Sequence, residues 1–431
     1  MYLVGGFMMK RKINYHFLIF GIIYILIGII MLVKGKTIPT IMIIILGYLL
    51  FLKGILSIIS LIFKRNKKII NVVASSILES LFGIFLIYNT RLALSFIAII
   101  FALYVLIFAI IDIIDLYIYW SNKISGKLSL VIHILINVIF FFLLISSPYK
   151  NLEIVLTIIS IYLILYGISN IGDFIIDIIP NNSKDKIKYQ IHIPLPIILA
   201  AIIPPQLIRK FNKGLDLEIN SNTKNNDKDV DLEIIIHLAE GGTAIFGHVD
   251  IAYNNKVYSY GNYNRHSRSL FNAIGDGIFM IADKNKYIKY LTEKQQRYLI
   301  VYGLNLNKAQ KKVLEKTIEK NIYTNTTDWH SDMELAKGNK KQFSDMSSEL
   351  YKYADAKYKK VIKGKNKTFF VFKTNCTLVA ETLIRPLGRA VLPISGIITP
   401  GTYYDCLERE YYKNNSNVIS KYIYYKKNDL K

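Results

Sequence analysis

The stretch AIFGHVDIAYNNKVYSYGNY, residues 244–263, decides how the C-terminal half of this chain is expected to fold. It predicts a β-hairpin, because two β-rich runs flank Asn254-Asn255 and asparagine tolerates the left-handed backbone of a tight two-residue turn. The first run alternates apolar residues toward a core, at Val249, Ile251 and Tyr253. His248 follows a glycine and lies on the opposite strand face, together with Asp250 and Ala252.

A second stretch, FFVFKTNCTLVAETLI at residues 369–384, supplies a candidate chemical partner for that histidine. Cys376 stands where an apolar strand gives way to a predicted helix. A thiol in the first helical turn faces unpaired backbone N–H groups and the positive end of the helix dipole, which lower its pKa. The same N–H groups can stabilise an oxyanion on a substrate carbonyl. A nucleophilic cysteine also needs a base, and His248 is the candidate, although each residue taken alone is more often structural.

The remainder of the C-terminal region is predicted to be α+β. Residues 277–283 and 287–292 are expected to form strands. Residues 292–320 are expected to form two helices, the second capped at Asn307. The stretch 324–365 is rich in Lys, Asp, Ser and Tyr, and is expected to be a polar excursion from the core.

Long apolar runs dominate the N-terminal half. A helix needs about 20 apolar residues to cross the bilayer core. Six runs have that length, at residues 14–33, 38–63, 69–88, 93–120, 127–147 and 152–179. They pair in sequence order into three hairpins that resemble one another, with GIIMLVKG at Gly28, GIFLIYNT at Gly83 and FFLLISSP at Phe141. The sequence therefore predicts a membrane domain of six helices arranged as three repeated hairpins.

The second helix of each predicted hairpin carries small and polar residues at matching offsets. Gly54, Ala109 and Gly167 fall in register. Polar residues follow at spacings of three, namely Ser57, Asp112 and Asn170, then Ser60, Asp115 and Asp173. This spacing gathers them on one helix face, which in lipid packs against other helices. The pattern resembles the HdeD-type acid-resistance membrane proteins over residues 14–179, and the resemblance implies a six-helix fold and a role in stress or envelope physiology.

Four ionisable residues lie within or near the predicted spans: Glu79, Asp112, Asp115 and Asp173. Such residues are functional candidates, because a charge inside a bilayer is costly. The alternative is that they are protonated, or hydrogen-bonded between helices as structural contacts. No relay with a basic residue is evident in the sequence, so their role stays open.

Composition separates the two halves and limits the partners. The chain has 54 Lys and Arg against 31 Asp and Glu, a net charge of +23. Residues 1–208 contain 17 basic and 7 acidic residues, and the remainder contains 37 and 24. The positive charge is thus spread over both halves, which favours a solvated surface or anionic lipid headgroups over a nucleic-acid partner. Only two cysteines occur, too few for a disulfide framework.

Loop charges predict the orientation in the membrane. The N-terminus and the loops after the second, fourth and sixth spans carry twelve Lys and Arg, against four in the opposite loops. Both ends of the six-helix unit are therefore expected to be cytoplasmic. The short apolar segment at 191–210 contains four prolines; were it a seventh span, the C-terminal domain would lie outside, but we favour a non-crossing segment. The predicted domains are 1–190 in the membrane, 191–231 as a connecting segment with a polar linker, and a soluble domain at 232–431.

The order of elements in that soluble domain resembles the circularly permuted branch of the NlpC-type papain-like cysteine hydrolases, whose relatives include lecithin:retinol acyltransferase-like enzymes. The matching motifs are Gly247-His248-Val249, Asn375-Cys376-Thr377 and Thr399-Pro400-Gly401. The resemblance spans roughly residues 232–410 and implies a permuted papain-like α+β fold with Cys376 as nucleophile and His248 as general base. The family's third polar residue comes from the strand after the histidine, where this chain offers Ser259 in place of the usual His, Asn or Gln.

Other polar residues near these motifs have simpler expected roles. Asp250 shares a strand face with His248 and is expected to be solvated, while His237 and His266 are substitute bases of lower rank. Trp329-His330 is expected to lie in a surface loop. Metal ligands are not clustered, and GDG at 275–277 lacks the Lys-Ser/Thr of a phosphate loop, so we expect no metal and no cofactor.

Three functions are compatible with these features of the sequence. The first is a membrane-anchored cysteine hydrolase or acyltransferase that forms a thioester with a peptide, amide or lipid acyl substrate at the envelope. The second is a non-catalytic, stress-related membrane protein whose soluble domain binds a partner or ligand. The third, a transporter or channel with a regulatory domain, is disfavoured by the few charges in the spans. The substrate, the choice between hydrolase and transferase, and the oligomeric state stay open.

Overall fold

The computed structural model describes residues 15–63, 69–178, 229–238, 247–336, 343–388, 391–392, 399–413 and 416–425. The chain forms two compact units. The first comprises Leu18–Tyr117 and Gly126–Ile171; the second comprises Gly172–Lys431 with Ile118–Ser125 and the chain start up to Phe17. The predicted segment at 191–210 and most of the predicted linker lie outside the described residues, so the expected domain boundaries stay predictions.

Six helices in the described residues are long and apolar enough to cross a membrane, which confirms that part of the prediction. They are α1 (His16–Lys34), α2 (Thr37–Phe63), α3 (Ile69–Tyr88), α4 (Thr90–Ser121), α5 (Lys127–Ser146) and α6 (Pro148–Ile178). Their apolar side chains are largely exposed in the isolated chain, as expected for surfaces that lipid covers.

Glycines set which of these helices pack most closely. A Cβ added to Gly47 of α2 would lie 2.9 Å from the carbonyl oxygen of Gly83 in α3. A Cβ added to Gly21 of α1 would lie 2.9 Å from the carbonyl oxygen of Gly167 in α6. These close backbone approaches therefore join α2 to α3 and α1 to α6, while the three repeated hairpins, α1–α2, α3–α4 and α5–α6, stay a prediction. Small residues permit this contact because they remove the side chain that would separate two backbones.

Some ionisable residues in the spans have polar neighbours that the sequence did not reveal. Lys53 of α2 lies 2.6 Å from Glu79 of α3. Asn137 of α5 donates to Asp112 of α4 at 3.3 Å. Asp115 is buried, and Asp173, which belongs to the second unit, forms a 2.7 Å ion pair there with Lys413.

The second unit contains an antiparallel sheet, into which eight strands of the described residues assemble in the order β10-β6-β1-β2-β3-β5-β8-β7. These are β1 (Leu232–Leu238), β2 (His248–Tyr253), β3 (Lys256–Gly261), β5 (Ile278–Asp283), β6 (Tyr298–Leu304), β7 (Thr326–Trp329), β8 (Lys357–Val361) and β10 (Val418–Tyr424). A separate two-stranded sheet pairs β4 (Ile274–Asp276) with β9 (Thr368–Phe370). The region is α+β, as predicted.

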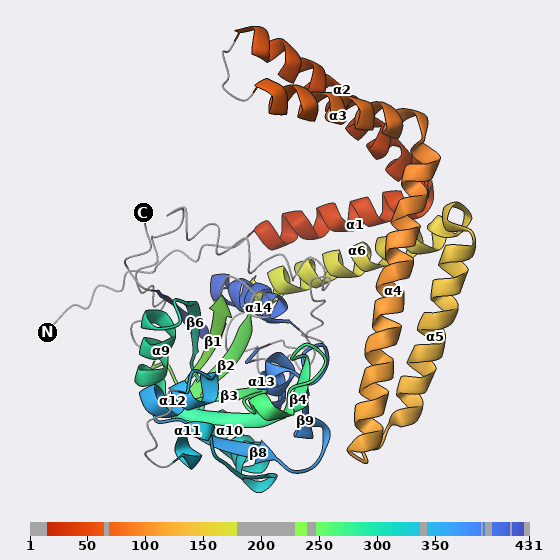
Figure 1. The fold of residues 1–431 in the computed structure, drawn as a ribbon. Helices are drawn as coiled ribbons and strands as arrows, with labels where there is room; N and C mark the ends of the chain where they lie inside the picture. The colour runs from red at the N-terminus through yellow and green to blue at the C-terminus, as the bar shows by residue number, and fades with distance from the viewer. Residues whose placement is uncertain are drawn as a thin grey trace, which may run out of the picture. The chain divides into compact units, whose positions relative to one another are not determined.

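Helices cover both faces of the large sheet (Figure 1). One face packs on α9 (Lys284–Glu293) and α12 (Met346–Ala354), and the other on α10 (Lys308–Ile318), α13 (Cys376–Ile384) and α14 (Pro400–Tyr412). The short helix α11 (Asp332–Leu335) precedes α12. The sheet is therefore the middle layer of three, and polar residues on its strands are shielded on either face.

Three of the sequence predictions are wrong in this region. Residues 287–292 belong to helix α9, and residues 298–304, expected within a helix, form β6. The presumed excursion at 324–365 contributes β7 and β8, which close one edge of the sheet. The hairpin of β2 and β3 is confirmed, with φ of 49° at Asn254 and 57° at Asn255.

Candidate active site

The candidate site forms where β2 and β3 separate. Their ladder pairs Tyr253 with Lys256, Ala252 with Val257 and Ile251 with Tyr258, and then ends. The first half of β2, which contains His248 and Asp250, stays paired with β1 on its other side. Helix α13 packs against both β2 and β3. The separation of the two strands thus gives the start of this helix access to the polar end of β2.

Cys376 is the first residue of α13, as predicted. Asn375 caps the helix, because its side-chain oxygen accepts from the N–H of Leu378 at 3.0 Å, and its amide donates to the carbonyl of Val371 at 2.9 Å. The thiol is buried, with the residue 7% exposed. Burial alone would raise its pKa, but the charge and hydrogen bond of His248, with a hydrogen bond from the N–H of Val249, lower the Cys376 pKa below its usual value.

His248 contacts the cysteine and two further side chains. Its Nε2 atom lies 2.9 Å from Oδ1 of Asp250 and 2.8 Å from Oγ of Ser259. These contacts leave Nδ1 as the ring nitrogen available to the Cys376 thiol. Burial would lower the His248 pKa, but the negative charges of Cys376 and Asp250 outweigh it and raise that pKa well above its ordinary value. The lowered pKa of the Cys376 thiol and the raised pKa of His248 both favour transfer of the proton from the thiol to the imidazole.

Asp250 is completely buried, which corrects the expectation that it is solvated. Helix α9 covers its strand face, and the hydroxyl of Tyr287 in that helix donates to Oδ2 at 2.7 Å. Nε2 of His237 lies 2.7 Å from the same oxygen. Burial would raise the Asp250 pKa, but His248 and His237 outweigh it and hold that pKa well below its ordinary value. Asp250 is thus an ionised carboxylate in contact with the candidate base.

His237 is the neighbour of His248 across the β1–β2 ladder, and their rings lie edge to face, 5.2 Å apart. It is 1% exposed, and burial lowers its pKa to about 4 despite the opposing charge of Asp250. The ring is therefore neutral at neutral pH, which makes His237 a poor substitute for the base. Its Nε2 atom lies close to the Asp250 carboxylate, but in the described residues neither ring nitrogen has the geometry of a hydrogen bond.

The remaining predicted site residues occupy different positions. Ser259 of β3 lies beside His248, as the resemblance implied, and its Oγ accepts a 2.7 Å hydrogen bond from Tyr263. His266 is exposed and pairs with Asp332, away from Cys376. His330, expected in a surface loop, follows β7 and contacts Glu334.

The Thr-Pro element after α13 also comes close to this end of β2. Thr399 caps α14, and Pro400 begins it. Gly247, which precedes His248, has a φ of +77°. A Cβ added there would lie 3.0 Å both from Cβ of Pro400 and from the carbonyl oxygen of His237. Glycine is therefore required by backbone conformation and by space at the residue that leads into the histidine.

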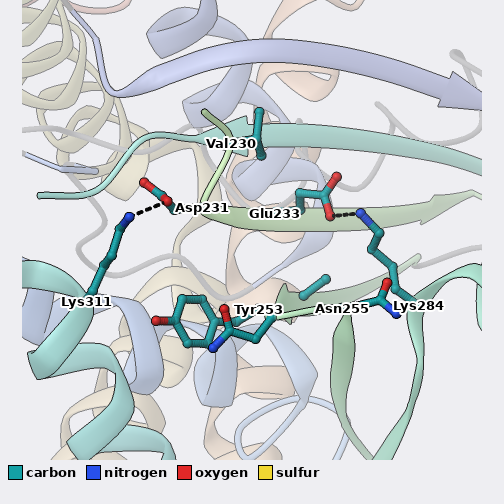
Figure 2. Close-up of a pocket in the computed structure, with 9 residues that line it drawn as sticks. Val230, Asp231, Glu233, Tyr253, Asn255, Lys284 and Lys311 are labelled. Atoms are coloured by element: carbon teal, nitrogen blue, oxygen red, sulfur yellow. Dashed lines mark hydrogen bonds and ion pairs between the residues drawn. The ribbon is translucent and has the colours of Figure 1, made fainter. Parts of the chain in front are cut away.

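A separate hollow of about 240 Å³ lies at the opposite, turn end of β2 (Figure 2). Its charged lining residues neutralise each other: Asp231 with Lys311 at 2.5 Å, and Glu233 with Lys284 at 2.6 Å. Cys376, His248, Asp250 and His237 are not among the residues that line it. Because these charges are already paired with each other and none of the candidate site residues lines the hollow, we do not place the chemistry there.

The arrangement at the His248 end has the residue types of a cysteine nucleophile site: a thiol whose pKa is lowered, a histidine whose pKa is raised, and a buried carboxylate 2.9 Å from that histidine. Sequence reasoning found the first two and named Ser259 third, but it missed the roles of Asp250, His237 and Tyr287. The signal for Asp250 was its shared strand face with His248; the cover supplied by α9 carried no sequence signal. Within the described residues, no group of His, Cys, Asp and Glu side chains is arranged to hold a metal ion.

Comparison with known proteins bears on the N-terminal half. Residues 19–88 match the family model described as a short repeat of unknown function (DUF308). No curated protein and no solved structure matches the chain. The DUF308 match spans all of α2 and α3 and most of α1. Together with the six apolar helices, it fits an HdeD-like membrane region in a multi-pass membrane protein.

Proposed function

We propose that this protein is a membrane-anchored cysteine hydrolase or acyltransferase in which Cys376 is the nucleophile. The observation that carries the proposal is the convergence of Cys376, His248 and Asp250 from a helix start and one strand, with ionisation states suited to nucleophilic attack. The order of the histidine strand and the cysteine helix supports a permuted papain-like arrangement. The loop charges support a cytoplasmic position for this domain.

Each chemical step can be assigned to these residues. The thiolate of Cys376 forms a bond to the substrate carbonyl carbon, and backbone N–H groups in the first turn of α13 stabilise the oxyanion. The C–N or C–O bond to the leaving group then breaks, and the imidazolium of His248 gives its proton to the departing nitrogen or oxygen. Water or another nucleophile next attacks the thioester and returns a proton to His248. The acyl group leaves, and the thiolate–imidazolium pair is restored.

Asp250 explains why the base can be charged inside the fold. A partly buried imidazolium loses hydration, which normally favours the neutral ring. The Asp250 carboxylate compensates, since it lies 2.9 Å from the histidine and accepts a hydrogen bond from Tyr287 that favours its ionised form. The substrate is an acyl compound, either a peptide or amide or a lipid ester, at the membrane envelope.

The test is the rate at which iodoacetamide alkylates Cys376 as a function of pH, measured by mass spectrometry on the full chain in detergent. We expect an inflection below the ordinary thiol pKa of about 8.5. His248→Ala should move the inflection upward and slow alkylation at neutral pH by roughly ten- to a hundredfold, because each unit of thiol pKa changes the thiolate fraction tenfold.

Two controls make this result specific. Cys406, a buried thiol whose pKa burial raises, serves as the internal reference within each sample. His266→Ala removes an exposed histidine and should leave the Cys376 profile unchanged. A Cys376 thiol that ignores His248→Ala, or that reacts no faster than Cys406, would overturn the enzyme proposal and favour the non-catalytic binding module.

A further inference from the structure

The loop between β3 and β4 ends in an unusually exposed apolar tip. Phe271 is 97% exposed and Leu270 is 52% exposed. The turn at 371–373, on the other side of the small β4–β9 sheet, adds Phe372, which is 48% exposed. The N–H of Val371 donates to the carbonyl of Ala273 at 3.0 Å, so the loop and the turn lie side by side. We define Leu270, Phe271 and Phe372 as the apolar tip.

The backbone holds this tip in a costly conformation. Leu270, Phe271 and Asn272 have φ values of 48°, 55° and 68°. Left-handed backbone is acceptable for asparagine but unfavourable for leucine and phenylalanine, because their Cβ atoms crowd the following carbonyl. Local hydrogen bonds hold the turn closed, from Ala273 N–H to the Leu270 carbonyl at 3.1 Å and from Ser269 N–H to the Ile274 carbonyl at 3.0 Å. A strained backbone that exposes large apolar side chains to solvent indicates that their exposure has a function.

The charges around the tip have one sign. The two segments that build it, residues 265–275 and 365–373, contain no Asp or Glu. Their basic residues are Arg265, Arg268, Lys365, Lys367 and Lys373. Of these, Arg265 forms an ion pair with Asp332, whereas the exposed guanidinium of Arg268 donates only to a backbone carbonyl among its described contacts. Asp276, the acidic residue that follows on β4, is paired with Lys360 at 2.7 Å.

We propose that the apolar tip docks on an anionic lipid bilayer. Aromatic and leucine side chains surrounded by basic residues are the chemistry that enters a headgroup region, the first by burial and the second by attraction to lipid phosphate. The chain supplies the opportunity, because its six membrane-length helices keep it at a bilayer. A second copy of this chain would need an acidic or apolar counterpart, whereas an anionic lipid surface satisfies both properties of the tip.

Docking at this point would act close to the nucleophile. The turn that carries Phe372 continues through Asn375 directly into Cys376, and Asn375 is bonded back to Val371 at 2.9 Å. Contact of the tip with lipid would therefore bring the start of α13 to the bilayer surface. The docking itself does not depend on the proposed acyl-transfer function, since it concerns a surface whose residues take no part in the chemistry.

The test introduces a tryptophan reporter into the full chain in lipid nanodiscs that contain phosphatidylglycerol and phosphatidylcholine brominated in the upper acyl chain. Bromine quenches tryptophan only at short range. Phe271→Trp should add fluorescence that is quenched several-fold more strongly than the fluorescence added by Leu335→Trp. Leu335 is the matched control, because it is an apolar residue of the same unit with 63% exposure.

Salt and charge reversal identify what holds the tip at the surface. At about 1 M salt, where the Debye length is about 3 Å, and with Arg268→Glu, quenching at position 271 should weaken. Equal quenching of the two reporters, or none at position 271, would overturn the proposal. So would an emission spectrum of the Phe271→Trp variant that shifts with protein concentration instead of lipid composition, because that result identifies a second copy of the chain as the occupant.

Discussion

His237 on β1 and His248 on β2 are directly opposite each other and contact the same carboxylate, yet their pKa values move in opposite directions. The pKa of His237 falls to about 4, whereas that of His248 rises well above normal. The rings differ in burial, because the side chain of His237 is 2% exposed and that of His248 is 25% exposed. They also differ in their charged neighbours: the positive charges of His248 and Arg297 lower the pKa of His237, whereas the negative charge of Cys376 raises that of His248. These differences favour a protonated His248 and a neutral His237.

This difference shows how one buried aspartate can serve two histidines without becoming protonated. Asp250 accepts a hydrogen bond from the hydroxyl of Tyr287, lies 2.7 Å from Nε2 of the neutral His237 ring, and has a charged partner in His248. If both rings were charged, the site would hold two cations close together, which is unfavourable. A neutral His237 avoids that repulsion, and the carboxylate stabilises the imidazolium. In this cluster, His237 on β1 would therefore position the carboxylate, and His248 on β2 would take part in proton transfer.

Removing the shared carboxylate should have the largest effect on this comparison. Asp250→Asn deletes the negative charge that raises the pKa of His248, so the histidine should lose its proton more readily and stabilise the Cys376 thiolate less. We expect iodoacetamide alkylation at neutral pH to slow by roughly tenfold, the change for one unit of thiol pKa. Thermal unfolding in detergent should reveal a loss of roughly 1.5–3 kcal/mol, the usual contribution of hydrogen bonds to a charged group.

The stability difference has a definite pH dependence. The folded-state pKa of Asp250 lies below its ordinary 3.8, so its contribution is fully present above that value and is lost as the pH falls through the lowered pKa. The gap between the parent chain and Asp250→Asn should therefore shrink in acid. Asp355→Asn is the matched control, because Asp355 is an exposed partner of Lys286 and should change little. A gap that stays constant below pH 3.8 would contradict a buried, ionised Asp250.

The membrane helices were the more predictable part of the fold. Their expected and observed limits differ by only a few residues, because an apolar run of membrane length has no competing interpretation. Residues 287–292 were misread as a strand, although Tyr287, Tyr290 and Leu291 are buried at helical spacing in α9. β6 was misread because its apolar run lies between segments rich in Lys and Gln that favour helices. The local pattern was weak in both places, and tertiary packing decided the structure.

The site was predictable only where a residue carries its own local signal. Cys376 had one, because the Asn cap and the following apolar helix are read along the chain. His248 and Asp250 shared a strand face in sequence, but their burial depends on α9, which reaches them from more than 30 residues away. His237 was predicted only as a substitute base; its position beside Asp250 could not be predicted, since its place opposite His248 is fixed by the register between β1 and β2.

Loss of His237 should have a smaller effect than loss of Asp250, and it tests whether β1 only positions the carboxylate. His237→Phe removes the ring nitrogen that lies 2.7 Å from Oδ2 while keeping an aromatic ring, so the Asp250 carboxylate should lose a polar contact. We expect the pH at the inflection of the Cys376 alkylation profile, which reports the thiol pKa, to rise by a fraction of a unit. His237→Gln restores an N–H donor and should recover the parent profile. Failure of Gln to do better than Phe would leave His237 with a packing role alone.

Ser259 should matter least of the three residues that surround the base, because it carries no charge. Its hydroxyl oxygen accepts from Tyr263 and can also accept from Nε2 of His248, but as a neutral acceptor it stabilises the imidazolium less than the Asp250 carboxylate does. Ser259→Ala should therefore slow alkylation less than Asp250→Asn and leave the inflection in place, with Tyr263→Phe having an equally small effect. If Ser259→Ala slowed alkylation more than Asp250→Asn, Ser259 would be the third polar residue of the site, as the family resemblance implied. Asp250 would then be a buried structural charge. The relative size of these two effects thus decides whether the histidine is supported from its own strand or from the next.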